Sequence, residues 1–205
     1  MKKKLLSLLL VCTLVLGMIP GAALAAETKS PFTDVKTTDW FFDAVQYAYD
    51  HNLMSGTGNN RFSPSETTTR GMMVTILHNM EGKPAAGSPA FTDVPAGEWY
   101  AAPVAWASAH GIVSGYGNGR FGPNDPITRE QMVAILYQYA RYKNYELTVT
   151  GDISTFDDYN ETSAYAVTPF NWAIGKGLVA GVGDHLLDPT GNAERSHIAA
   201  IMKSF

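Results

Sequence analysis

Three arginines recur where a cation is not expected. In the stretch "PITREQM", Thr128 and Gln131 predict a capping box that places Arg129 at the first position of a helix. A helix start carries the positive end of the helix dipole and disfavours a cation there by about 0.3 to 1 kcal/mol. Arg70 and Arg195 occupy matching places. An arginine fork beside unsatisfied helix-start N–H groups would form a pocket for a planar anion, a carboxylate or a phosphate.

A structural role for the same arginines remains open. Each guanidinium could pair with a carboxylate of its own module and tie a loop to a helix, because arginine forks also suit carboxylates inside proteins. The candidate partners, which also fit as caps that fasten the entry of each unit, are Asp34, Asp93 and Asp158. The two roles can hold in different units.

Glycine-rich loops precede the arginines. They read "GTGNN", "GYGNG" and "GVGDH", and their central glycines are Gly58, Gly117 and Gly183. Such glycines serve either a turn with positive φ or the close approach of a ligand. The loops lack the dense acidic pattern of a calcium-binding EF-hand, so we expect no metal and no cofactor.

Two tryptophans stand at or before predicted helices. Trp40 and Trp99, with Tyr165 as the nearest equivalent, would serve as packing residues or would stack on a sugar ring. No Ser-His-Asp order recurs among the three units, and the one cysteine lies near the N-terminus. We therefore expect no catalytic residues and a protein that is not an enzyme.

A repeat organises the chain. Shifting the sequence by 59 residues aligns 32–81 with 91–140, and 21 of the 50 positions are identical, "FTDV" among them. A third, diverged copy matches Arg129 with Arg195. Periods of this size indicate a supersecondary unit repeated in space. We expect a signal peptide at 1–25 and repeats at 28–87, 88–147 and 148–205.

Each unit is predicted to be helix, loop, helix. The first helix of unit one is expected from about Trp40 to His51, with Asp39 as its N-cap, and Leu147 and Val149 suggest a short strand. The second helix follows each arginine and carries apolar residues at i, i+3, i+4 and i+7, as in Met132, Ile135, Leu136 and Tyr139. Because one such hairpin cannot bury its own apolar face, three should share a core with approximate threefold symmetry.

The N-terminus and the charge bound the compartment and the partners. Lys2 to Lys4, an apolar run and an A-x-A site predict a secretory signal peptide that ends at Ala25. Without it, 12 basic residues face 19 acidic ones, a formal charge of −7. This balance argues against a nucleic-acid binder that acts through bulk charge. An anionic ligand must be held by local geometry.

Together these motifs give a family resemblance. "FTDV", "SGYGNGRFGP" and "ITRE" resemble the S-layer homology (SLH) domain, and three copies cover nearly all of the chain after the signal peptide. The resemblance implies a mostly α fold, with three helix-loop-helix repeats in a pseudo-threefold spindle around a central helical bundle. It also implies a secreted protein of the cell wall or S-layer.

The resemblance further implies a ligand. Proteins of this family attach non-covalently to a secondary cell-wall polysaccharide, commonly pyruvylated, through grooves between repeats and the arginine of the T-R-A-E motif. Those positions are Arg70, Arg129 and Arg195 here, although Glu194 replaces the capping threonine of unit three. Arg129→Ala is then expected to weaken wall binding more than tenfold without unfolding the protein. The alternative is a structural envelope protein that acts through self-association or a protein partner.

Overall fold

The computed structural model describes residues 30–148 and 151–205. The expected signal peptide and Val149 of the expected strand lie outside these ranges. Within them the chain is helical, with six α-helices and two short 3-10 helices, η1 (Ile153–Thr155) and η2 (Tyr159–Glu161). The α-helices are α1 (Phe42–Asp50), α2 (Arg70–Met80), α3 (Ala101–Ala109), α4 (Arg129–Tyr142), α5 (Val167–Gly175) and α6 (Arg195–Ser204).

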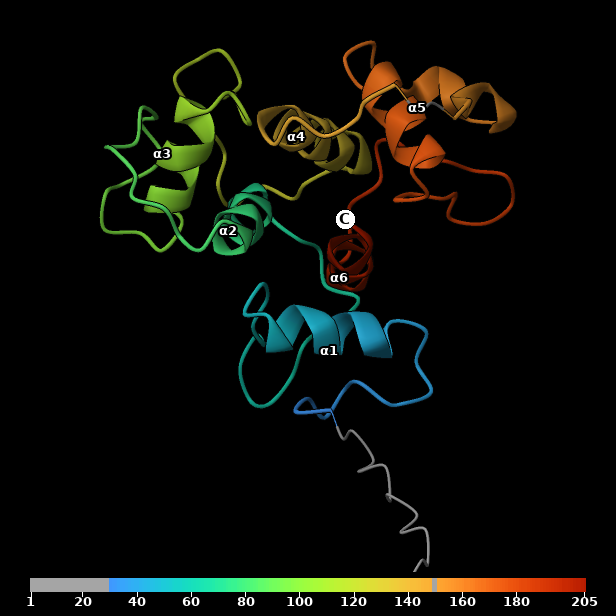
Figure 1. Cartoon of the computed structure of the whole chain (residues 1–205), viewed down its shortest axis with the longest axis horizontal. Helices are drawn as coiled ribbons and strands as arrows, with labels where there is room; N and C mark the ends of the chain where they lie inside the picture. The colour runs from blue at the N-terminus through green and yellow to red at the C-terminus, as the bar shows by residue number, and fades with distance from the viewer. Residues whose placement is uncertain (1–29, 149–150) are drawn as a thin grey trace, which may run out of the picture.

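The second helices of the three repeats form the centre. α2, α4 and α6 surround a common axis, while α1, α3 and α5 lie outside them (Figure 1). Each outer helix packs on the inner helix of the preceding repeat, in the pairs α3 on α2, α5 on α4 and α1 on α6. The last pair joins the third repeat to the first. The mostly α, three-repeat fold expected from the sequence is therefore confirmed.

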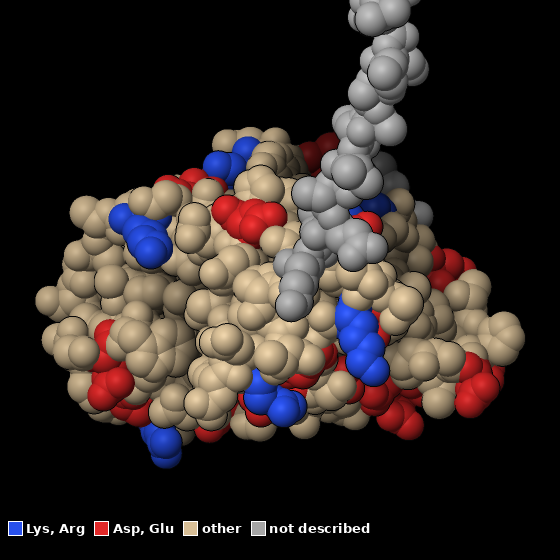
Figure 2. Space-filling model, turned by 90° about the horizontal axis from the view of Figure 1, so that it is seen from below, with Lys and Arg blue, Asp and Glu red and all other residues tan. Residues whose placement is uncertain are grey.

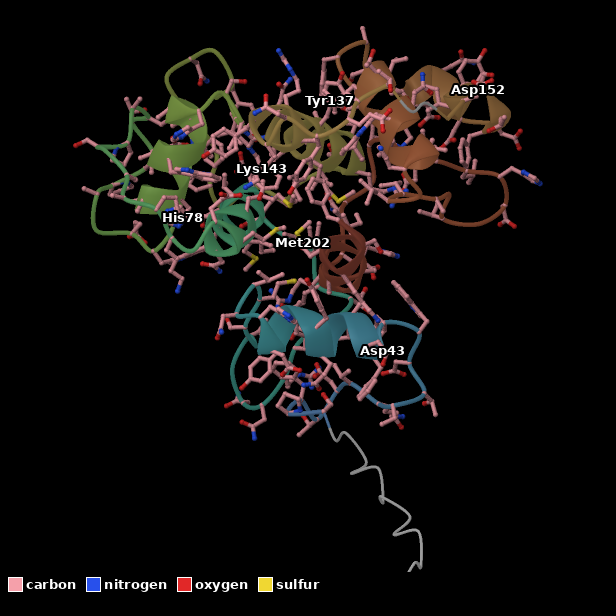
Figure 3. All side chains as sticks on the ribbon, viewed as in Figure 1. Asp43, His78, Tyr137, Lys143, Asp152 and Met202 are labelled. Atoms are coloured by element: carbon pink, nitrogen blue, oxygen red, sulfur yellow. The ribbon has the colours of Figure 1, made fainter. Side chains whose placement is uncertain are left out.

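The apolar stripes of the inner helices form the core. Met132 and Leu136 are fully buried, and so are Met73 and Leu77 at the matching places of α2. Met202 of α6 is also buried and lies where α6 faces the other inner helices (Figure 3). The i, i+3, i+4 and i+7 spacing of the apolar residues therefore turns one face of each inner helix toward the other inner helices, as in an amphipathic helix.

The start of the first helix differs from the expectation. α1 begins at Phe42 with Phe41 as N-cap, and Asp39 accepts a hydrogen bond from the N–H of Lys36 at 2.8 Å. Asp39 closes a turn before the helix, so Trp40 stands outside α1 in that turn. Pro103 lies two residues after the start of α3, in the first turn, where its missing N–H costs no helical hydrogen bond.

The segments that enter the inner helices close a ring. Thr68 N–H donates to Ala193 O at 2.8 Å, Ala193 N–H donates to Ile127 O at 2.9 Å, and Ile127 N–H donates to Thr68 O at 2.9 Å. All three residues are buried. Each repeat therefore bonds to both others through its backbone, and the starts of α2, α4 and α6 are fixed relative to one another.

Candidate binding site

Each candidate arginine reaches into the next repeat. Arg129 donates from Nε to Leu187 O and from Nη2 to Ala180 O, both at 2.9 Å. The equivalent bonds run from Arg70 to Phe121 O (2.9 Å) and Ser114 O (3.2 Å), and from Arg195 to Phe62 O (2.8 Å) and Ser55 O (2.7 Å). The three side chains are only 5 to 6% exposed. The expected alternative, pairing with an aspartate of the same module, is wrong.

The helix-start N–H groups are also occupied. Arg129 N–H donates to Gly191 O at 2.8 Å, and Glu130 N–H donates to Pro189 O at 2.9 Å. The first two N–H groups of α2 and of α6 make the same bonds to the following repeat. The expectation that unsatisfied helix-start amides form an anion pocket is therefore wrong. These N–H groups donate to backbone carbonyls of the following repeat.

These bonds explain the unusual arginine. The loop that meets each helix start presents carbonyl oxygens. Their partial negative charge offsets the positive end of the helix dipole and the positive charge of the guanidinium. Burial lowers the pKa of Arg129, while the nearby charges of Asp188 and Asp158 oppose that change. The cation is thus tolerated at the helix start because it belongs to an interface.

The three aspartates shape the acceptor loops. Asp93 accepts hydrogen bonds from the N–H groups of Phe121 and Gly122, both at 2.8 Å. Asp34 and Asp158 make the equivalent pairs of bonds at 2.7 to 2.9 Å. Burial opposes the ionisation of Asp93, but the two N–H donors and the charge of Arg120 hold its pKa below the ordinary value. Each aspartate thereby fixes the loop whose carbonyl receives an arginine.

One edge of two guanidinium groups remains available. Arg70 Nη1 lies 3.4 Å from Gln131 Oε1, whereas Nη1 of Arg129 and of Arg195 has no hydrogen bond within 30–148 and 151–205. Neither Nη1 atom is fully buried, because the fully buried side-chain atoms that lack a hydrogen bond in those ranges all belong to other residues. We conclude that both Nη1 edges reach the surface. A carboxylate could accept a charge-assisted hydrogen bond there.

Exposed aromatic side chains stand at the same interfaces. Trp40 is 64% exposed, and Trp99 and Tyr165 are each 54% exposed. The ring of Trp40 stacks on His197 of α6, with centroids 5.3 Å apart. Tyr165 donates its O–H to Glu130 at 2.9 Å. Burial and this hydrogen bond raise the pKa of Tyr165, and the nearby charge of Arg70 opposes the rise. Trp40 and Tyr165 thus sit where one repeat meets another, and the repeat offsets assign Trp99 to the equivalent place.

The loop glycines take a local role in the structure. Gly58, Gly117 and Gly183 have φ values of 114°, 85° and 115°, and no heavy atom lies within 4 Å of a Cβ added to any of them. Positive φ is the reason for glycine at these turns. The open space beside them leaves the ligand role that the sequence suggested as a prediction.

We define three junctions by their arginines. Contacts place Gln131, Glu130 and Tyr165 at the Arg70 junction, and His197 and Trp40 at the Arg129 junction. The repeat offsets add Ser196 to the Arg129 junction and assign Met72, Gly71 and Trp99 to the Arg195 junction. Members at the same place are related by the repeat offsets of 59 and 66 residues. Sequence reasoning assigned none of Gln131, His197 and Met72 to the binding site, although these offsets already mark them as equivalent positions two residues after each arginine.

The Arg70 junction contains more of its own polar groups than the others. Glu130 accepts from Ser163 N–H at 3.0 Å as well as from Tyr165, and Tyr116 donates to Asp125 at 3.0 Å. The Tyr116 ring also lies 4.8 Å from the guanidinium carbon of Arg70. This junction is therefore partly filled by acids and phenols of the protein itself.

Away from the arginines, the described residues form another concave candidate. A hollow of about 350 Å³ lies at the far end of the bundle from the arginines, between Tyr145, Trp172, Lys176 and Phe205. Within the described ranges, no three His, Cys, Asp or Glu side chains are grouped to hold a metal ion, and no helix is long and apolar enough to cross a membrane. Lys and Arg appear as separate spots among acidic residues on the face shown in Figure 2.

These features define a protein built from three interlocked helix-loop-helix repeats, and the chain belongs to the S-layer homology domain family. The family matches at 31–72, 90–133 and 155–199, one segment within each expected repeat. The matched segments contain Arg70, Arg129 and Arg195.

Three similar proteins share this region. An endoglucanase of Bacillus sp. (strain KSM-635) is 31% identical over 98% of this chain and 22% of its own length. An amylopullulanase of Thermoanaerobacterium thermosulfurigenes is 33% identical over 87% of this chain and 10% of its own. The surface-layer 125 kDa protein of Lysinibacillus sphaericus is 28% identical over 90% of this chain and 16% of its own. The chain thus spans less than a quarter of each of these relatives.

Proposed function

We propose that this protein is a non-catalytic module that anchors itself at the cell surface by binding an acidic cell-wall polysaccharide. The ligand is a pyruvylated secondary cell-wall polymer, and it binds at the junctions between repeats. Membership of the S-layer homology family and similarity to a surface-layer protein support anchoring at the surface. The single observation that carries the choice of ligand is an exposed aromatic ring beside an accessible guanidinium edge.

The chemistry of a pyruvylated sugar fits this pair of groups. Its carboxylate would accept a hydrogen bond from Nη1 of Arg129, and the apolar face of its ring would stack on Trp40. The expected charge of −7 provides no bulk attraction for an anion, so the contact must be local. Binding of one polymer at two junctions would add avidity without any new contact.

The junctions differ in how well they suit an anion. Each guanidinium has an aspartate near it, Asp125 at Arg70 and Asp188 at Arg129. The Arg70 junction also contains Glu130, bonded to Tyr165, where the Arg129 junction has Ser196. Like charges near the ligand would oppose its binding. We therefore expect the Arg129 junction to bind more tightly than the Arg70 junction.

Sedimentation with purified cell walls tests this function. We expect Trp40→Ala to weaken wall binding about fivefold to tenfold, because one stacking contact is worth about 1 kcal/mol. Tyr145→Ala is the matched control, since Tyr145 is 47% exposed but follows the far end of α4. It should leave binding unchanged.

The treatment of the walls separates the alternatives. Removal of the pyruvate, or of the whole polymer, should abolish binding of the unsubstituted protein. Binding that survives both treatments would instead support self-association or a protein partner in the envelope. Release of soluble sugar from the walls would contradict a non-catalytic role.

A further inference from the structure

We propose that His197 is a second cationic contact in the Arg129 junction and makes binding of the acidic saccharide there stronger as the pH falls. The proposal rests on the proposed function and concerns one junction of the three. It assigns a role to the residue at the fourth position of the T-R-A-E motif, where repeat three has histidine in place of glutamate.

The position of His197 places it beside the guanidinium edge. His197 is the third residue of α6, as Gln131 is the third residue of α4. Gln131 Oε1 lies 3.4 Å from Nη1 of Arg70, so the repeat geometry puts His197 next to Nη1 of Arg129. A ligand carboxylate at this edge would lie within reach of the imidazole.

The stack on Trp40 orients the imidazole. The two rings are 5.3 Å apart, with their planes inclined by 33°, and His197 is half-buried while Trp40 is largely exposed. α1 packs on α6, which holds the indole against the helix start. When the imidazole is protonated, the face of the indole also favours its charge.

The charges around His197 favour a neutral imidazole in the free protein. Burial lowers its pKa, the charge of Arg129 on α4 lowers it further, and Glu194 at the N-cap of α6 opposes both. Asp188 and Asp158 face the same guanidinium from the third repeat. Trp40, on the side of α1, contributes no formal charge.

A bound carboxylate changes this balance. Its negative charge beside His197 favours the imidazolium, so the pKa of His197 is higher in the complex than in the free protein. Binding then takes up a proton. The affinity rises as the pH falls through the pKa of the complex, and it levels off below the pKa of the free protein.

The other junctions provide internal controls. Gln131 and Met72 stand at the place of His197, and neither side chain titrates in this pH range. Substitution of Trp99 and Tyr165 by alanine removes the aromatic contacts of the other two junctions and leaves Trp40 in place. The double variant W99A/Y165A therefore reports on the Arg129 junction.

The experiment is calorimetric titration of W99A/Y165A with a synthetic pyruvylated disaccharide at pH 7.5 and 5.5. The sugar carboxylate remains ionised over this range. We expect the affinity to rise about fivefold to tenfold toward pH 5.5. His197→Gln or His197→Met, the residues of the other repeats, should flatten the profile while thermal unfolding shows a folded protein.

A transplant makes the test stricter. Met72→His in a W40A/Y165A background should introduce the same pH dependence at the Arg195 junction. Binding with a flat profile in W99A/Y165A, or an unchanged slope in His197→Gln, would overturn this inference alone. Absence of binding by the unsubstituted protein at both pH values would overturn the proposed function, and the inference with it.

Discussion

Arg129→Ala should destabilise the fold, in contrast to the expectation from sequence that it affects binding alone. Arg129 is 5% exposed and donates two hydrogen bonds at 2.9 Å to carbonyls of the third repeat. A hydrogen bond from a charged group is worth about 1.5 to 3 kcal/mol. Loss of both would lower the free energy of unfolding by about 3 to 6 kcal/mol, a large part of the 5 to 15 kcal/mol usual for a domain.

Urea unfolding followed by tryptophan fluorescence measures this loss. The matched control is Arg120→Ala, since Arg120 makes one ion pair with Asp93 at 3.5 Å and its side chain is 62% exposed. Exposed pairs contribute about 0 to 1 kcal/mol, so the control should change stability little. A loss below about 1 kcal/mol in Arg129→Ala would refute the reasoning that these bonds hold the repeats together.

Two further predictions test the interfaces. Gly71→Ala should lower the free energy of unfolding by about 1 to 3 kcal/mol, because the added Cβ would lie 2.7 Å from Pro123 O. Gly87→Ala is the control in the same urea assay and should be neutral, because its Cβ would meet nothing within 4 Å. Asp93 has a lowered pKa, so its stabilisation is complete above the unfolded value near 3.8 and is lost as the pH falls through the folded value. Asp93→Asn should therefore reduce the loss of stability measured by acid titration below about pH 4, and an unchanged acid profile would contradict the role of the loop N–H bonds.

The fold could be predicted because its signals are local and repeated. The apolar spacing of Met132, Ile135 and Leu136 defines one helix face, and the 59-residue offset shows that the same face occurs again. Thr128 indicated the start of α4, where its hydroxyl accepts from Gln131 N–H at 3.3 Å. The first helix was predicted too long, because Asp39 can cap a turn as readily as a helix.

The partners of the arginines could not be predicted in the same way. Arg195 bonds to Phe62 O, which lies 133 positions away in the chain. A repeat pattern makes Phe62, Phe121 and Leu187 equivalent, but it does not say whether an arginine contacts its own unit or the next one. That choice follows from the packing of α1 on α6 and its counterparts, which is a property of the assembled ring.

The ring also explains how the junctions can differ while the fold is kept. The bonds that join the repeats run from arginine side chains and helix-start N–H groups to backbone carbonyls, so the receiving loops need a backbone shape more than particular side chains. Leu186 can thus replace the arginine found at positions 61 and 120, and Glu194 can replace a capping threonine, while Arg195 still bonds to the first repeat. The bonds that join the repeats do not require a particular side chain two positions after each arginine. A single frame can therefore hold three different side chains beside its guanidinium groups, and differences in binding among the junctions need not cost the stability that their shared bonds provide.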